Sequence, residues 1–355
     1  MSWDTWSHYA PPQFNTRARQ PVDLPTFLQY ILPAFLCYCM SAILTLRSHP
    51  FVIRLGFLPA TLYAMYRCAV VLDLSNGEET QMHLNQLLLI LTTVSSMRAT
   101  IWTFSEAPCK ISDPSKSTLS RLLTSLRGIG WNWGANVYIP PERRPTSSRF
   151  VLPVRSRLTR LASVGGGTIL DGPLPTLRST YITLLSVVVM YCAMQSEYDA
   201  ATPSWHPTEW PPLFDDPWLS TSLSQFWARR WHQALKPVYV SFGGIPLGPG
   251  RVGMVLGSFT TSAVIHYLGV WGMGHRAKFW DSGCLFLVSA IGVLAEGAFR
   301  RVFGVRVGGL WGWIWTMAWL LFWSNYLVDA WAQVGMIGAS PFPKSMRPVD
   351  ILGWT

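Results

Sequence analysis

Residues 27–46 read FLQYILPAFLCYCMSAILTL, a run of apolar and uncharged polar residues without a single charge. A lipid bilayer needs about 20 consecutive apolar residues for one helical crossing. The run is too long for the apolar part of a cleaved signal peptide. We therefore expect it to stay in the protein as its first membrane span.

Comparable runs recur along the chain. They predict an all-α, polytopic transmembrane bundle of about seven to eight spans with a re-entrant segment. The predicted spans are Phe27–Leu46, Phe51–Leu72, Leu84–Phe104, Tyr181–Met194, Val252–Trp271, Phe279–Phe299 and Leu310–Trp331.

The composition agrees with a membrane protein. Half of the 355 residues are hydrophobic and only 13% are charged, about half the charge of an ordinary soluble domain. Nineteen tryptophans suit a bundle with many crossings of the membrane interface. The net charge of +10 collects between the apolar runs, which indicates topology and attraction to anionic membrane lipid, with no nucleic-acid partner.

Several chemistries lack their sequence signatures. The six cysteines form no CxxC pair and lie mostly in apolar stretches, so we interpret them as buried apolar residues and predict no metal site. P-loop, GxSxG, HExxH and DDxxD motifs are missing from the sequence. Asp215-Asp216 stands alone beside a proline, which does not support magnesium-dependent prenyl chemistry.

Positive charge predicts the orientation. The range 106–178 holds eleven Lys/Arg against four acidic residues, so we expect it in the cytosol and the N-terminus in the lumen. Arg300, Arg301 and Lys236 should also be cytosolic, which conflicts with the order of the later spans. A re-entrant passage between Glu197 and Arg251 would remove the conflict.

The chain divides into five predicted parts. They are a polar N-terminal segment (1–26), the first three spans (27–105), the basic cytosolic loop (106–178), a catalytic membrane region (179–335) and a C-terminal tail (336–355).

The segment 224–237, SQFWARRWHQALKP, combines aromatic, basic and histidine side chains. In an α-helix, Trp227 and Trp231 share a face. One interpretation is an interfacial amphipathic helix with its arginines on lipid phosphates. The other is a site in which Arg229 and Arg230 bind an anionic substrate beside His232.

Two further residues are candidates. His266 lies in the middle of an apolar span, where a histidine is costly and by default functional, although a hydrogen-bonded core histidine is the alternative. A neutral imidazole in an apolar site can act as a general base. Glu296 precedes Arg300 by four residues, so an ion pair within the helix is the first interpretation and a place in the substrate cavity the second.

FWARRWHQ at 226–233, followed by His266 in SAVIH, resembles the wax synthase-like branch of the membrane-bound O-acyltransferases. RGIGWNW at 127–133 and PLFDDPWLSTSLSQFW at 212–227 resemble fungal O-acetyltransferases of terpenoid and meroterpenoid biosynthesis. The resemblance covers residues 127–301. Ala228 stands where relatives often have glycine.

The resemblance implies acyl transfer from a CoA thioester to a hydroxyl without a covalent acyl-enzyme. His266 would be the general base, His232 would orient the thioester, and Arg229 and Arg230 would meet the CoA phosphates. The remaining substrate-binding candidates are Trp227, Trp231 and Glu296.

The same resemblance favours acetyl-CoA as co-substrate, with no bound cofactor, and a lipophilic terpenoid alcohol as acceptor at the endoplasmic reticulum. A fatty acyl donor that makes wax or sterol esters stays open. The residues leave two other functional classes as alternatives. One is a terpene cyclase, for which only Glu296 could supply the buried acid. The other is a transporter, for which no internal repeat is found.

Overall fold

The computed structural model of the chain describes residues 19–78, 81–106, 109–110, 119, 122–123, 125–134, 138–141, 168–201, 211–248, 250–273 and 278–338. Helices make up nearly all regular structure within these residues. The strands found there are β1 (Gln20–Pro21) and β2 (Leu72–Asp73), a short parallel pair.

Seven long helical segments coincide with the seven predicted spans. They are the continuous helix of α1 (Leu24–Thr26), η4 (Phe27–Ile31) and α2 (Leu32–Leu46), followed by α3 (Phe51–Val71), α4 (His83–Phe104), α7 (Leu177–Ala201), α10 (Arg251–Gly272), α11 (Phe279–Phe303) and α12 (Gly309–Gln333).

Five of these helices are both long and apolar enough to cross a membrane: the first, α4, α7, α10 and α11. The other two, α3 and α12, form at their predicted positions but are less apolar by composition. Arg54 and Arg67 lie in α3, and α12 is rich in tryptophan, whose indole N–H makes it less apolar than an aliphatic side chain. The predicted helical membrane bundle is confirmed, while no eighth long helix occurs among the residues described.

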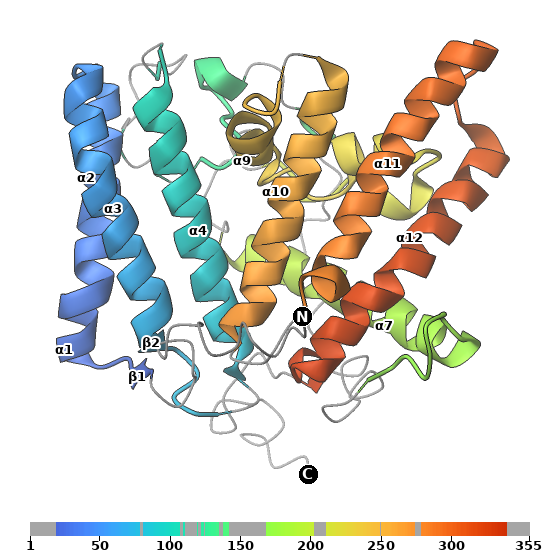
Figure 1. Cartoon of the computed structure of the whole chain (residues 1–355), viewed down its shortest axis with the longest axis horizontal. Helices are drawn as coiled ribbons and strands as arrows, with labels where there is room; N and C mark the ends of the chain where they lie inside the picture. The colour runs from blue at the N-terminus through green and yellow to red at the C-terminus, as the bar shows by residue number, and fades with distance from the viewer. Residues whose placement is uncertain are drawn as a thin grey trace, which may run out of the picture.

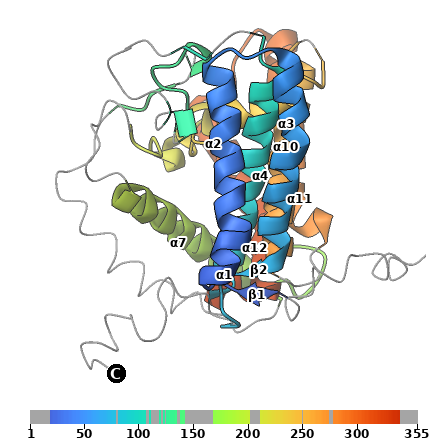
Figure 2. The ribbon, with the colours of Figure 1, turned by 90° about the vertical axis from the view of Figure 1, so that its left-hand side faces the viewer.

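Six of the long helices stand side by side in a row, in the order α2 and α3, α4, α10, α11, α12 (Figure 1). When the row is seen edge-on, α7 lies against one of its faces, with its axis inclined to the axes of the helices in the row (Figure 2). Among the described residues, the two largest apolar clusters lie in this row. One joins α2, α3 and α4, and the other joins α7, α10, α11 and α12.

One end of the bundle, here called the β end, carries β1 and β2. Arg19 Nη1 donates to the carbonyl oxygen of Gly272, the last residue of α10, over 2.8 Å. One buried cluster unites Ile169 and Met273 with Val334 just after α12, and Met82 just before α4 packs against it. Residue 169 therefore lies at the end where α4 begins.

The opposite end holds the residues that follow α4. Arg98, near the end of α4, donates to the carbonyl oxygens of Leu122 and Leu123. Arg54, near the start of α3, donates to the carbonyl oxygens of Trp102 and Ser105. The turns at 47–50 and after α4 thus share this end.

The structure accordingly separates the two described parts of the predicted cytosolic range. The described residues among 109–141 lie at the end where α4 finishes, and residues 168–178 lie at the β end. The side of the membrane on which the range 106–178 lies stays a prediction, as does the re-entrant passage between Glu197 and Arg251.

Candidate active site

The segment between α7 and α10 is built from short helices. They are η8 (Pro217–Leu219), α8 (Leu223–Gln225), η9 (Phe226–Arg230), α9 (Lys236–Tyr239) and η10 (Val240–Gly244). These pieces pack on α4, α10 and α11. Irregular backbone needs protein partners for its polar groups where water is absent, and most residues of this segment are buried or partly buried.

Glycines let this segment approach the long helices closely. A Cβ atom on Gly257 of α10 would lie 2.0 Å from the carbonyl oxygen of Gly243 in η10. A Cβ atom on Gly292 of α11 would lie 2.5 Å from the Leu223 side chain. The backbone of the segment therefore rests directly on α10 and its side chains on α11.

The tryptophan-rich motif forms a π-helical turn. In η9 the backbone N–H of Trp231 donates to the carbonyl oxygen of Phe226, five residues earlier. Phe226 and Trp231 stack, with ring centroids 5.3 Å apart, whereas Trp227 turns to Phe259 and Phe286 of α10 and α11. The expectation that Trp227 and Trp231 share a face is wrong, because the wider turn shifts the register by one residue.

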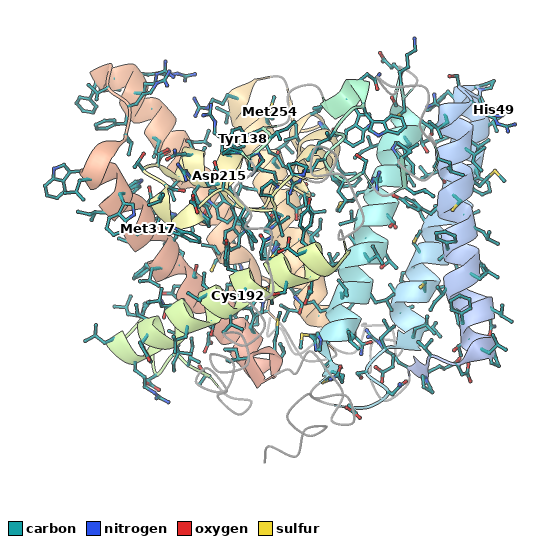
Figure 3. The ribbon with its side chains drawn as sticks, turned by 180° about the vertical axis from the view of Figure 1, so that it is seen from behind. His49, Tyr138, Cys192, Asp215, Met254 and Met317 are labelled. Carbon is teal, nitrogen blue, oxygen red and sulfur yellow. The ribbon has the colours of Figure 1, made fainter. Side chains whose placement is uncertain are left out.

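The two arginines of the motif have different environments. Arg230 Nη1 donates to the carbonyl oxygens of Asp215 and Asp216 over 2.9 and 3.0 Å. Arg229 is exposed, with its guanidinium carbon 5.7 Å from the centre of the Tyr138 ring. Tyr138 in turn donates to Asp215 Oδ2 over 2.7 Å, and Figure 3 shows these two labelled residues close together. Arg229 can therefore meet a substrate anion, while Arg230 stabilises the turn at 215–216.

Arg127 joins two of the motifs that carried the sequence resemblance. Its Nη1 donates to the carbonyl oxygens of Pro211 and Pro212, and its guanidinium lies over the Tyr198 ring. The neighbouring Gly128 has a φ of +71°, and a Cβ there would collide with Trp133. RGIGWNW thus supports the start of the short-helix segment.

His232 follows η9 within an aromatic environment. Its ring centre lies 5.7 Å from that of Trp231 and 6.2 Å from that of Phe214. Burial lowers the pKa of His232 to about 3, and the neighbouring His266 and Arg127 add to the shift because each would repel a second positive charge. The imidazole is therefore neutral at physiological pH.

His266 is held in one tautomer and one orientation. Its Nδ1 lies 2.8 Å from the carbonyl oxygen of Ser262. Because a carbonyl oxygen only accepts, Nδ1 of the ring must carry the hydrogen. In the neutral ring Nε2 then keeps its lone pair. Phe286 stacks on the ring at a centroid distance of 4.0 Å.

The structure brings the two histidines together from separate elements. His266 comes from α10 and His232 from the turn after η9, and Phe286 is in ring contact with both His266 and Trp227. Both histidine residues are partly buried. Phe286 and Tyr138 were not expected from the sequence, since a lone phenylalanine or tyrosine gives no signal of its own.

Glu296 does not pair with Arg300. Its Oε1 accepts from the backbone N–H of Leu223 over 2.7 Å, and its Oε2 accepts from that of Ser224 over 3.0 Å. Trp315 Nε1 also donates to Oε1 over 3.3 Å. The predicted ion pair within the helix is wrong because the start of α8 offers two unpaired N–H groups nearby. Glu296 thus contacts the start of α8, and its place in a substrate cavity stays a prediction.

Comparison with known proteins gives one family. The sequence profile described as the membrane bound O-acyl transferase family matches residues 210–288. This stretch contains the short-helix segment and both histidines. The resemblance predicted from the tryptophan-rich motif is confirmed.

Three similar proteins have related names. Acetyltransferase eriL of Hericium erinaceus is 28% identical over 39% of this chain and 40% of its own. Probable long-chain-alcohol O-fatty-acyltransferase 2 of Arabidopsis thaliana is 32% identical over 26% and 30%. Acetyltransferase ple2 of Rhodocybe pseudopiperita is 22% identical over 65% and 70%. The match thus spans less than half the length of the first two relatives.

Proposed function

From the membrane bound O-acyl transferase signature of residues 210–288, we propose that the chain transfers an acyl group from a CoA thioester to the hydroxyl of a lipophilic alcohol. The observation that carries the proposal is that two histidines inside that signature lie within electrostatic range of each other, one of them with a defined tautomer. His266 presents an Nε2 lone pair because Ser262 occupies its Nδ1 hydrogen.

The reaction follows from these groups. His266 Nε2 takes the proton of the acceptor hydroxyl as the oxygen attacks the thioester carbonyl carbon. The C–O bond forms, the C–S bond breaks, and the CoA thiolate receives the proton that His266 had taken. The neutral His232 imidazole offers a hydrogen-bond donor to the carbonyl oxygen, where negative charge develops. A thioester is already activated, so no covalent acyl-enzyme is needed.

Charge at the opposite end from β1 and β2 suits a CoA donor. Arg229 is exposed there and is held by the face of Tyr138, and an arginine fork matches phosphate oxygens. Two relatives named as acetyltransferases favour acetyl-CoA over a fatty acyl-CoA. A terpenoid alcohol made at the endoplasmic reticulum is the acceptor class that we propose.

The terpene cyclase alternative depends on Glu296 as its acid, and the contacts of Glu296 do not favour that role. Such an enzyme needs a buried carboxylic acid that donates a proton. Both oxygens of Glu296 accept hydrogen bonds from backbone N–H groups of α8. The carboxyl group is therefore bonded to the protein backbone, which favours a structural role over proton donation to a substrate.

The test compares membranes that carry the wild-type chain, His266→Ala and His49→Ala. Labelled acetyl-CoA and a long-chain acyl-CoA are offered with a panel of terpenoid and fatty alcohols. Removal of a general base should reduce ester formation by at least about 100-fold. His49→Ala is the matched control, because His49 lies far from the short-helix segment (Figure 3). Full activity in a folded His266→Ala variant would refute the assignment of the base.

A further inference from the structure

Glu296 is a buried carboxylate on α11, with 8% of its surface exposed. The first N–H groups of a helix have no partner inside that helix, and in α8 they include those of Leu223, Ser224 and Gln225. Glu296 accepts from the first two, and the Ser222 hydroxyl oxygen accepts from the third. All three of these N–H groups therefore have partners, and two of the three bonds come from another helix.

Further contacts hold the same stretch against the α11–α12 pair. Trp313 Nε1 donates to the carbonyl oxygen of Trp218 over 2.8 Å. A Cβ on Gly312 would lie 2.3 Å from the carbonyl oxygen of Thr221, and one on Gly292 would touch Leu223. We call this set of contacts to residues 218–224 the clasp. Glu296 provides its two charge-assisted hydrogen bonds, which are the strong ones.

The clasp lies directly before the motif. Helix α8 continues without a break into η9, which carries Trp227 and Arg229, and His232 follows two residues after η9 ends. The same helix α11 that bears Glu296 also bears Phe286, the ring that stacks on His266. One rigid helix therefore contacts the supports of both histidines.

We infer that Glu296 is a positioning residue that sets the place of His232 relative to His266 by anchoring the start of α8. It acts through α8 and η9 and touches no reacting atom. The kinetic part of this inference rests on the proposed acyl transfer. The geometric part, that the environment of His232 depends on Glu296, does not.

The chain offers a matched control for a buried carboxylate that only stabilises the fold. Asp329 Oδ1 accepts from the backbone N–H groups of Ile169 and Leu170 and from the Thr168 hydroxyl. Asp329 is as buried as Glu296, at 6% exposed, and it anchors a segment at the β end, away from the motif. If substitution of each carboxylate only destabilised the fold, substitutions of Glu296 and of Asp329 should have similar effects.

The experiment compares Glu296→Gln with Asp329→Asn. Glutamine keeps the shape of glutamate but turns one acceptor oxygen into a donor NH₂, so one N–H of α8 loses its partner. We expect kcat per folded molecule to fall by about 10- to 100-fold, the scale of a catalytic group displaced by about an ångström. Asp329→Asn should lower the yield of folded protein and leave kcat unchanged. If Glu296→Gln does not fold, Trp315→Phe takes its place in the test. This substitution removes the indole donor to Glu296, and we expect a smaller loss of kcat.

A second readout does not depend on activity. The rate at which diethyl pyrocarbonate modifies His232, followed by mass spectrometry, reports the surroundings of the imidazole. We expect that rate to change severalfold in Glu296→Gln and to match wild type in Asp329→Asn. Equal kcat and equal modification rates in both variants and wild type would overturn the inference. If Glu296→Gln changes the modification rate of His232 while the wild-type chain makes no ester, the positioning inference stands and the proposed acyl transfer is refuted.

Discussion

At the scale of single residues, arginine has two uses in this protein that the sequence does not distinguish. Arg19, Arg98, Arg127 and Arg230 each donate to backbone carbonyl oxygens of a distant segment. Arg229, directly beside Arg230, is exposed. The sequence predicted both members of the pair as phosphate ligands, because the turn that occupies Arg230 lies at 215–216 and is not adjacent in sequence.

This difference gives a prediction for two neighbouring substitutions. Arg229→Ala should raise the KM for acyl-CoA by about tenfold or more, since a hydrogen bond to a charged group contributes about 1.5–3 kcal/mol. It should leave the melting temperature near that of wild type. Arg230→Ala should lower the melting temperature, because two buried carbonyl oxygens lose their donor. Steady-state kinetics and thermal unfolding in detergent measure the two effects.

The reverse pattern would contradict this division of tasks. A destabilised Arg229→Ala with an unchanged KM would mean that Arg229 supports the fold. Arg229→Lys is a useful companion, because lysine keeps the charge but loses the planar group that lies over Tyr138. Its KM should fall between those of wild type and Arg229→Ala.

At the scale of elements, the sequence predicted the long helices well and the short ones poorly. Apolar runs of about 20 residues place α2, α3, α4, α10, α11 and α12 because the bilayer requires them. The turn of η9 was expected to be α-helical, and its π-helical register appears only once Trp227 has packed between α10 and α11. Local spacing cannot reveal a register that tertiary packing selects.

The contact between η10 and α10 leads to a prediction about glycine. Gly257→Ala would place a Cβ 2.0 Å from the Gly243 carbonyl oxygen, so the two elements must move apart. Forcing a methyl group into a packed contact costs about 1–3 kcal/mol, and the melting temperature should fall by several degrees. Intrinsic tryptophan fluorescence during heating measures it.

Gly56→Ala is the control for that substitution. Gly56 lies inside α3 with open space around its Cβ position. Alanine is a better helix former than glycine by about 0.8–1 kcal/mol, so Gly56→Ala should keep or raise the melting temperature. A similar loss in both variants would show that the close approach of α10 and η10 is not the cause.

At the scale of the whole molecule, part of the positive charge is internal. The net charge of +10 was interpreted as a signal of topology and lipid attraction. Several of the basic groups instead donate to backbone carbonyls that helix ends and turns leave unpaired. A count of basic residues therefore overstates the charge that faces solvent or lipid.

Long-range contacts also separate the described parts of the range 106–178. Charge statistics treat a loop as one unit, whereas the structure bonds Leu122, Leu123 and Ser125 to Arg98 of α4 and residues 168–170 to Asp329 of α12. Contacts across about 160 residues of sequence, such as Thr168 with Asp329, leave no periodic or compositional trace. His266 was found because a histidine is costly in an apolar span, and His232 because it lies in the aromatic and basic segment 224–237.

Opposite placement of the two parts can be tested with single cysteines. Ala228 and Gly172 are both exposed, and no atom lies near the Cβ position of Gly172. We expect a membrane-impermeant thiol reagent to label Ala228→Cys in sealed microsomes, where the cytosolic face is outside. Gly172→Cys should react only after the vesicles are opened with detergent. Gln233, although in the same motif, is a poor probe because it is 1% exposed.

The six native cysteines give a labelling background that is common to both variants. The wild-type chain measures this background, so the additional labelling reports the introduced cysteine alone. Labelling of both cysteines in sealed vesicles would place residues 172 and 228 on one side, which α7 rising from the β end does not allow. Labelling of Gly172→Cys alone would invert the bundle and put Arg229 in the lumen. A CoA donor from the cytosol could then not reach Arg229, so the same measurement also bears on the proposed path of the acyl donor.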